Sequence, residues 1–128
     1  MKSSREDVIV KKANTTTPES MVKFATDGNV AMHVTDLEKA ENFYGRILGF
    51  KLLKKTNERL VYDTGKITLY IVKDDRIIPF IPALEVDDYD KAKQYLVKNG
   101  CRISKEWPEE RALYFEDPFG VVIDIVEK

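Results

Sequence analysis

The fold is decided by a stretch that the sequence contains twice. Residues 31–40 read AMHVTDLEKA, and residues 83–92 read ALEVDDYDKA. Ala, Val, Asp, Lys and Ala fall at the same places in both stretches, and the similarity continues beyond them. Residues 59–62 (RLVY) match residues 111–114 (RALY) in the same way. Internal similarity of this kind is typical of a protein built from two copies of one structural unit.

Each copy predicts a short strand followed by a helix. In the first copy, Thr35 and Glu38 have the spacing of a capping box, with Thr35 accepting backbone N–H groups at the helix start. In the second copy, Asp87 or Asp88 can cap the helix. The apolar residues that follow recur on one helical face, which is the pattern of a helix packed against a sheet.

Three strand-like runs follow each helix, after a glycine (Gly49 or Gly100) at which the helix can end. The predicted strands are 50–54, 59–63 and 66–72 in the first copy, and 101–105, 111–116 and 121–126 in the second. The sequence therefore predicts an α/β fold of the α+β type, with two tandem βαβββ modules over about 28–76 and 77–128. One such module buries too little surface to be stable alone, so we expect the two to pack together in a single domain, 28–128.

The first 27 residues differ from the rest of the chain. They are mainly polar, lack sustained periodicity and predict a flexible N-terminal arm. A second interpretation is that Val8-Ile9-Val10 forms a strand that clasps a partner in a dimer.

The sequence begins without an apolar signal segment and has no run near the roughly 20 apolar residues needed to span a bilayer. We expect a cytoplasmic protein without a membrane partner.

Charge and cysteine content narrow the possible functions. The net charge of −1 provides no strong positive field, which argues against a nucleic-acid partner held by phosphate neutralisation. The single cysteine, Cys101, excludes a disulfide within the chain and a thiolate-rich metal site. We interpret Cys101 as a small buried hydrophobic residue.

Several motifs together resemble the vicinal oxygen chelate superfamily. They are residues 34–40 (VTDLEKA), 43–44 (FY), 48–50 (LGF) and 114–120 (YFEDPFG). The superfamily includes glyoxalase I, fosfomycin-resistance thiol transferases, extradiol dioxygenases and bleomycin-resistance binding proteins. The resemblance covers about residues 28–128 and implies that the two modules curve into a cupped mixed sheet. It does not select one function, because this fold hosts several chemistries.

In the active members of that superfamily, a divalent metal lies inside the cup. The resemblance places the four metal-ligand positions at Asn29, Tyr70, Ile81 and Asp124. Only Asp124 is a good ligand; Asn29 offers a weak carbonyl oxygen, and Ile81 offers none. First-row metals generally need three or more imidazole or carboxylate ligands. We therefore expect no metal and no other cofactor, and the sequence favours a protein that is not an enzyme.

Seven residues are candidates for ligand contacts in the cup: Asn29, His33, Tyr62, Tyr70, Trp107, Tyr114 and Asp124. A carboxylate in the apolar run 121–126 either faces a polar cavity or pairs with a buried cation, and we favour the cavity. His33, the only histidine, either contacts a ligand or is a hydrogen-bonded, half-buried residue. The aromatic residues either stack on a flat ligand or pack within the sheet and at its edge.

The leading hypothesis is a metal-free small-molecule binding protein resembling the bleomycin-resistance proteins. It would hold an aromatic or cationic compound in the cup or in the groove of a homodimer. One alternative is a divalent-metal-dependent glyoxalase, thiol transferase or dioxygenase. A second alternative is a structural or regulatory dimer without a ligand, which predicts a cup filled by side chains.

Overall fold

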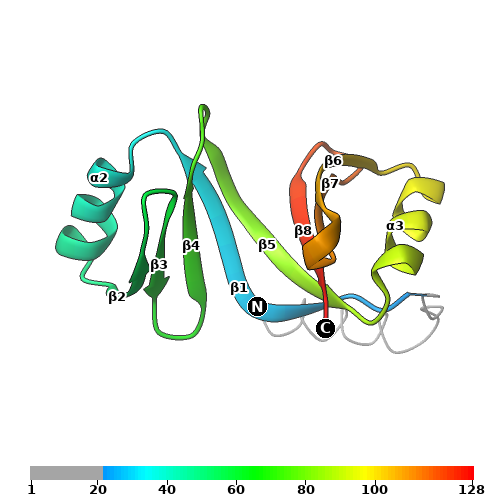
Figure 1. Cartoon of the computed structure of the whole chain (residues 1–128), viewed down its shortest axis with the longest axis horizontal. Helices are drawn as coiled ribbons and strands as arrows, with labels where there is room; N and C mark the ends of the chain where they lie inside the picture. Colours follow the sequence, from blue (N-terminus) through cyan, green and yellow to red (C-terminus); the bar gives the residue numbers. More distant parts are fainter. Residues whose placement is uncertain (1–21) are drawn as a thin grey trace, which may run out of the picture.

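The computed structural model describes residues 22–128 and contains one eight-stranded sheet, in the order β2-β3-β4-β1-β5-β8-β7-β6 (Figure 1). The first half of the chain forms β1 (Ala25–Val34), α2 (Leu37–Ala40), a π-helix η1 (Glu41–Ile47), β2 (Lys51–Lys55), β3 (Arg59–Asp63) and β4 (Thr68–Lys73). The second half forms β5 (Ile78–Val86), α3 (Tyr89–Lys98), β6 (Arg102–Trp107), a 3-10 helix η2 (Pro108–Glu110), β7 (Ala112–Glu116) and β8 (Val122–Glu127). The predicted succession of elements is confirmed.

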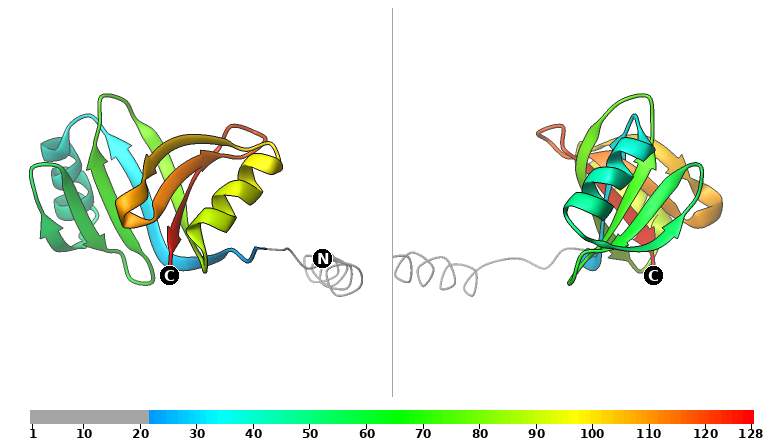
Figure 2. Two further views of the ribbon diagram at one scale, coloured as in Figure 1. Left: turned by 45° about the vertical axis from the view of Figure 1, so that its right-hand side comes forward. Right: turned by 90° about the vertical axis from the view of Figure 1, so that its left-hand side faces the viewer.

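The two halves repeat one topology. Within the first module β1 pairs with β4 in parallel, and within the second β5 pairs with β8 in parallel. The modules join where β1 pairs with β5 in the antiparallel sense. α2 with η1 lies outside one end of the sheet and α3 outside the other, so the two halves of the sheet face each other (Figures 1 and 2). The predicted mixed sheet of two tandem βαβββ modules is thus confirmed.

The helix starts show one difference from the sequence prediction. Asp36 caps the first helix: its Oδ1 accepts the backbone N–H of Lys39 at 3.0 Å, while its own backbone is extended. Asp88 accepts the N–H of Lys91 at 3.0 Å in the second helix. The prediction of Thr35 as the first cap is therefore wrong by one residue, because the chain turns into the helix only after Asp36.

Each helix packs against its half of the sheet through one apolar cluster. One contains Met32, Ala40, Leu60, Tyr62, Leu69 and Ile71; the other contains Val86, Tyr89, Ala92, Leu96, Leu113, Phe115 and Ile125. Because alternate residues of a strand point to opposite faces, these clusters occupy the helix-covered face of each module. The intervening strand residues are therefore left for the opposite face.

The ordered sheet begins earlier than the sequence suggests. β1 starts at Ala25, three residues before the boundary expected at 28, and Phe24 packs beside Tyr95 with ring centroids 6.4 Å apart. Phe24 also contacts the apolar cluster of the second module, which accounts for the earlier start. The alternative strand at Val8-Ile9-Val10 lies outside the described residues. None of the described helices is long and apolar enough to cross a membrane.

Candidate ligand site between the modules

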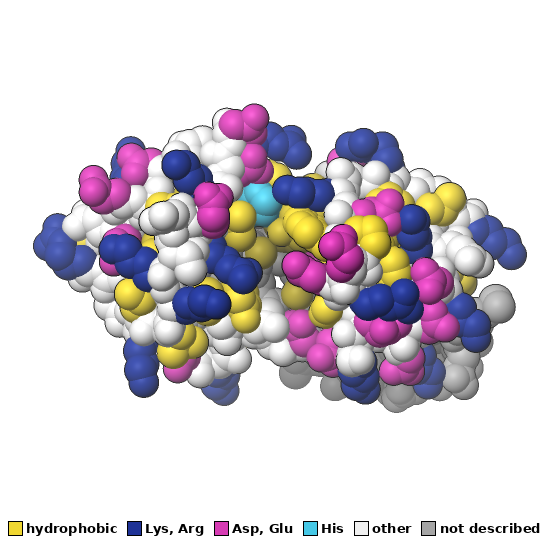
Figure 3. All heavy atoms as spheres, in the orientation of Figure 1, with side chains coloured by type: hydrophobic (Ala, Val, Ile, Leu, Met, Phe, Trp, Pro, Cys, Tyr) yellow, Lys and Arg dark blue, Asp and Glu magenta, His cyan; other side chains and the backbone are white. Residues whose placement is uncertain are grey.

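The face of the sheet opposite the helices, here called the concave face, carries most of the candidate residues. Ala31 pairs with Tyr70 on β4 and with Ile81 on β5, and Tyr114 on β7 pairs with Asp124 on β8. Directly paired residues point to the same face. Ala31, Ile81 and Tyr114 also form one buried cluster, against which Tyr70 packs. Figure 3 shows the surface hollowed between the two modules, with hydrophobic side chains along its walls.

The four positions implied as metal ligands do not fit a metal. The strand registers place Asn29, Tyr70, Ile81 and Asp124 on the concave face. Ile81 is fully buried and has no donor atom, and Tyr70 would have to bind as a phenolate. Within residues 22–128, no group of three or more His, Cys, Asp or Glu side chains is placed to hold a metal ion. The donor set falls short of what first-row metals require.

Metal binding gives a direct check of this conclusion. Untagged, chelator-treated protein is expected to show no saturable rise in melting temperature with Mn²⁺, Fe²⁺, Ni²⁺ or Zn²⁺. A metal bound at about 100 times its dissociation constant would add about 2.7 kcal/mol, a shift of several degrees in thermal unfolding. A saturable rise in melting temperature with one of these metals would contradict the conclusion that the four positions do not bind a metal. It would favour a metal-dependent enzyme.

Asp124 is the unusual polar group of the concave face. Its Oδ1 atom is buried, and no hydrogen-bond donor among the described residues reaches it. Burial raises the pKa of this carboxyl group to about 7, and the negative charge of Asp27 adds to the rise. Among residues 22–128, the Asp124 carboxylate thus has no cationic partner of the kind that the structural interpretation of the sequence required. A carboxylate in this state is an acceptor without a donor.

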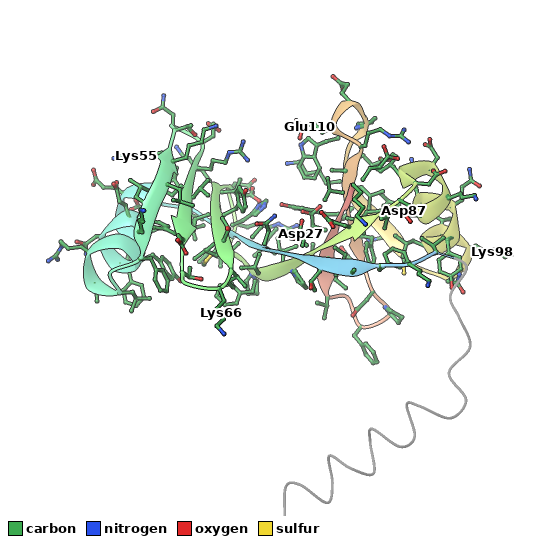
Figure 4. The ribbon with its side chains drawn as sticks, turned by 90° about the horizontal axis from the view of Figure 1, so that it is seen from below. Asp27, Lys55, Lys66, Asp87, Lys98 and Glu110 are labelled. Atoms are coloured by element: carbon green, nitrogen blue, oxygen red, sulfur yellow. The ribbon has the colours of Figure 1, made fainter. Side chains whose placement is uncertain are left out.

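Asp27 comes close to Asp124 because β1 is irregular at this point. The pairing of β1 with β5 shifts between Thr26 and Val30, and Gly28 has a φ of 84°, which favours glycine. The Asp27 side chain accepts the backbone N–H of Asn29 at 2.9 Å. Figure 4, seen from below, places Asp27 near the middle of the molecule, between the modules. The concave face therefore has a negative region around Asp27 and Asp124.

His33 lies in a hydrogen-bonded array that crosses from one module to the other. Its Nδ1 donates to Oδ2 of Asp74 at 2.7 Å, because an ionised carboxylate only accepts. Its Nε2 forms a second hydrogen bond, 3.0 Å long, with the hydroxyl of Tyr114. His33 is 3% exposed and Tyr114 is also buried, whereas Asp74 is half-buried. The hydrogen bond to His33 lowers the pKa of Asp74 to about 2, and burial raises the pKa of Tyr114.

Three aromatic residues flank these polar groups. Trp107 packs edge-on against Tyr114, with ring centroids 4.8 Å apart, and Tyr70 contacts the same cluster from the other module. Trp107 and Tyr70 are half-buried, so part of each side chain stays exposed. Tyr114 is buried and packs in the core of the concave face. Tyr70 and Trp107 are therefore the aromatic side chains available at this surface.

Tyr62 lies on the other face of the sheet. It belongs to the helix-covered cluster of the first module and is 1% exposed. Its hydroxyl lies so close to Gly45 of η1 that a Cβ there would be 2.8 Å away. The predicted equivalence of Tyr62 and Tyr114 is wrong by one residue: Val61, which pairs with Tyr70, occupies the place of Tyr114. A shift of one residue moves a strand side chain to the opposite face.

Three further residues of the concave face were missed by the sequence interpretation: Asp27, Asp74 and Arg76, the last of which lines a small hollow beside His33 and Asp74. Asp27 precedes a glycine within a strand, a pattern that suggests a bulge. Asp74 and Arg76 lie in the connection after β4 and have no distinctive motif. Only the return of this connection to the end of β1 brings Asp74 to His33, where the Asp74 N–H donates to the carbonyl of Val34 at 2.9 Å.

Comparison with known proteins agrees with the fold and with the paired modules. Residues 28–125 match the family described as Glyoxalase/Bleomycin resistance protein/Dioxygenase superfamily. The chain belongs to this superfamily. A search of curated proteins finds no match.

Solved dioxygenase structures share the fold. A variant of homoprotocatechuate 2,3-dioxygenase from B. fuscum has a TM-score of 0.66 and 22% identity, over 87% of this chain and 35% of that chain. An extradiol ring-cleaving dioxygenase from B. fuscum gives 0.65 and 21%, over 88% and 36%. The complex of the Brevibacterium fuscum enzyme with 3,4-dihydroxyphenylacetate gives 0.65 and 22%, over 87% and 40%. This chain thus spans well under half the length of these enzymes.

Proposed function

We propose that the protein binds a small organic molecule without a metal, on the concave face between the modules. The ligand carries a protonated amine or amidine that donates to Asp124. The observation that carries the proposal is the buried Oδ1 of Asp124, which has no donor among the described residues. An unpaired buried acceptor costs about 1–3 kcal/mol, and more when it is charged. A ligand that supplies the donor removes this cost.

The surroundings of Asp124 favour a cation over a neutral donor. Asp27 adds a second negative charge, and the two carboxylates repel each other when both are ionised. A bound cation relieves this repulsion. Tyr70 and Trp107 offer the faces and edges of aromatic rings, which attract cations and flat apolar groups. An arylalkyl amine matches both features.

Another observation favours the ligand-free alternative in one part of the concave face. His33, Ile78 and Tyr114 are buried, so side chains close the end of the face near His33. The half-buried residues, including Asp27, Asn29, Tyr70 and Asp124, lie away from that end. The amine site therefore belongs to this more open part. The homodimer and the cytoplasmic location inferred from the sequence stay predictions.

The proposal predicts charge-selective, pH-dependent binding. Benzylamine and benzamidine are expected to bind more tightly than benzyl alcohol and benzamide, in titrations followed by NMR. Only the ionised Asp124 attracts a cation. As the pH is raised toward about 7, the affinity for the amines is therefore expected to increase about tenfold per pH unit, and above about pH 8 it levels off. Asp124→Asn is expected to abolish both the preference and the pH dependence.

The matched control is Asp87→Asn, which removes the same charge from an exposed residue (Figure 4). This variant is expected to bind the amines like the unaltered protein. Equal affinity for charged and uncharged compounds would contradict the proposal, as would unchanged binding by Asp124→Asn. If no compound of either kind binds saturably, the structural alternative becomes the better account.

A further inference from the structure

A second polar feature lies near the closed end of the concave face. It is a hollow of about 60 Å³ whose polar lining comprises His33, Asp74, Arg76, Ser104, Lys105 and Tyr114. A buried water needs roughly 10–15 Å³ on this measure, so the hollow holds a group of about four non-hydrogen atoms. This is the size of a carboxylate with a short stem, and it is too small for a whole aromatic ligand.

The charges around the hollow favour an anion. Arg76 has no hydrogen-bond or ion-pair partner within residues 22–128. The Lys105 ammonium lies 5.1 Å from the centre of the Trp107 ring and forms no ion pair with a described residue. The one carboxylate of the hollow, Asp74, already accepts from His33 and from the backbone N–H of Asp75. The hollow therefore contains two positive charges, from Arg76 and Lys105, and one negative charge, from Asp74, whose oxygens already have hydrogen-bond donors. The excess positive charge favours an anionic ligand.

We propose that this hollow binds the carboxylate of a small organic acid, with Arg76 and Lys105 as its cationic contacts and Ser104 as a hydroxyl donor. A guanidinium and an ammonium that line the same hollow can both form charge-assisted hydrogen bonds to one carboxylate. The hydrogen-bonded array of Asp74, His33 and Tyr114 gives the hollow a fixed wall. This carboxylate site does not depend on the amine site at Asp124.

Together with the proposed function, on which this step rests, the hollow defines the ligand more closely. Val122 also lines the hollow, and Asp124 lies two residues further along β8. Two strand residues span about 7 Å. Tyr114 lies between Asp124 and the hollow: it pairs with Asp124 across β7 and β8, and its hydroxyl forms a hydrogen bond with His33. The ligand class is then an amino acid in the broad sense, with its ammonium and carboxylate about 7 Å apart across a flat spacer.

The carboxylate site is tested with acetate alone. ¹H–¹⁵N NMR titrations with sodium acetate, at constant ionic strength with sodium chloride, are expected to give saturable shifts at His33, Ser104 and Lys105. Arg76→Gln and Lys105→Gln are each expected to weaken acetate binding about tenfold, and Arg76→Lys less than Arg76→Gln. Lys66→Gln, which removes a charge from an exposed turn residue (Figure 4), is expected to leave binding unchanged.

Shifts that do not saturate, shifts reproduced by chloride, or equal affinity in Arg76→Gln and Lys105→Gln would overturn the carboxylate site. In a second titration, 4-(aminomethyl)benzoate is expected to bind at least tenfold more tightly than benzoate or benzylamine. Acetate binding is expected to survive Asp124→Asn, which separates the two sites. Saturable acetate binding without amine binding would contradict only the proposed function. Amine binding without acetate binding would contradict only the carboxylate site.

Discussion

His33→Ala is expected to lower the free energy of unfolding by about 3 kcal/mol, which corresponds to roughly 10 °C in melting temperature for a domain of this size. The imidazole is 3% exposed and satisfies both Asp74 and the Tyr114 hydroxyl. Its removal takes one hydrogen bond from Asp74, leaves the buried Tyr114 hydroxyl without its partner, and opens a cavity at the junction of the modules. Urea unfolding at pH 7, followed by circular dichroism, measures the effect.

A double-mutant cycle separates the hydrogen bond from the cavity. Tyr114→Phe alone is expected to cost about 1 kcal/mol, and His33→Phe combined with Tyr114→Phe is expected to cost less than the sum of the two single changes. The non-additive part reports the contact between β1 and β7. Strict additivity, or a loss below about 1 kcal/mol for His33→Ala, would show that the array contributes little to stability.

Asp124→Asn is expected to stabilise the protein above neutral pH. The pKa of Asp124 is about 7 when folded and near its ordinary value of 3.8 when unfolded, so the folded state holds this proton more tightly. Stability of the unaltered protein therefore falls as pH rises from about 4 to about 7 and is level above that range. Allowing for partial exposure, the ionisation costs on the order of 3 kcal/mol, which the uncharged amide avoids.

The measurement is the difference in unfolding free energy between the unaltered protein and Asp124→Asn, from pH 5 to pH 9. The advantage of the variant is expected to grow by about 2 kcal/mol between pH 5 and about pH 7 and to stay level from there to pH 9. Asp74 and Glu127 do not interfere, because their pKa values of about 2 lie below it. Parallel pH profiles for the two proteins would contradict the raised pKa.

Much of the fold was predictable because the two copies support each other. The repeated stretches and the glycines at 49 and 100 located the helices and the strands after them. Both glycines have the positive φ expected at a helix end, 79° and 89°. The strand register was less predictable, since the short segments RLVY and RALY align by identity one residue away from their structural equivalence. That error placed Tyr62 on the wrong face.

The site was predictable only where it lies on regular strands. Asp124 stood out as a carboxylate in an apolar run, and no donor from the described part of the chain reaches its Oδ1. Asp27 and Asp74 reach the site through a bulge and a connection, whose paths depend on the packing of both modules. Neither local propensity nor periodicity contains that information. The role of His33 was undecided for the same reason, because its partners come from the connection after β4 and from β7.

The pairing of β1 with β4 and β5 also has a consequence for the order in which the protein folds. β1 is the first described strand of the sheet, yet both of its neighbours are made later, β4 at Thr68–Lys73 and β5 at Ile78–Val86. β5 in turn pairs with β8 (Val122–Glu127), which is also made later. The central strands β1 and β5 are therefore complete only after β4 and β8, which follow them in the sequence, have been synthesised. Such non-local pairing slows folding and leaves β1 exposed to intermolecular contacts during synthesis.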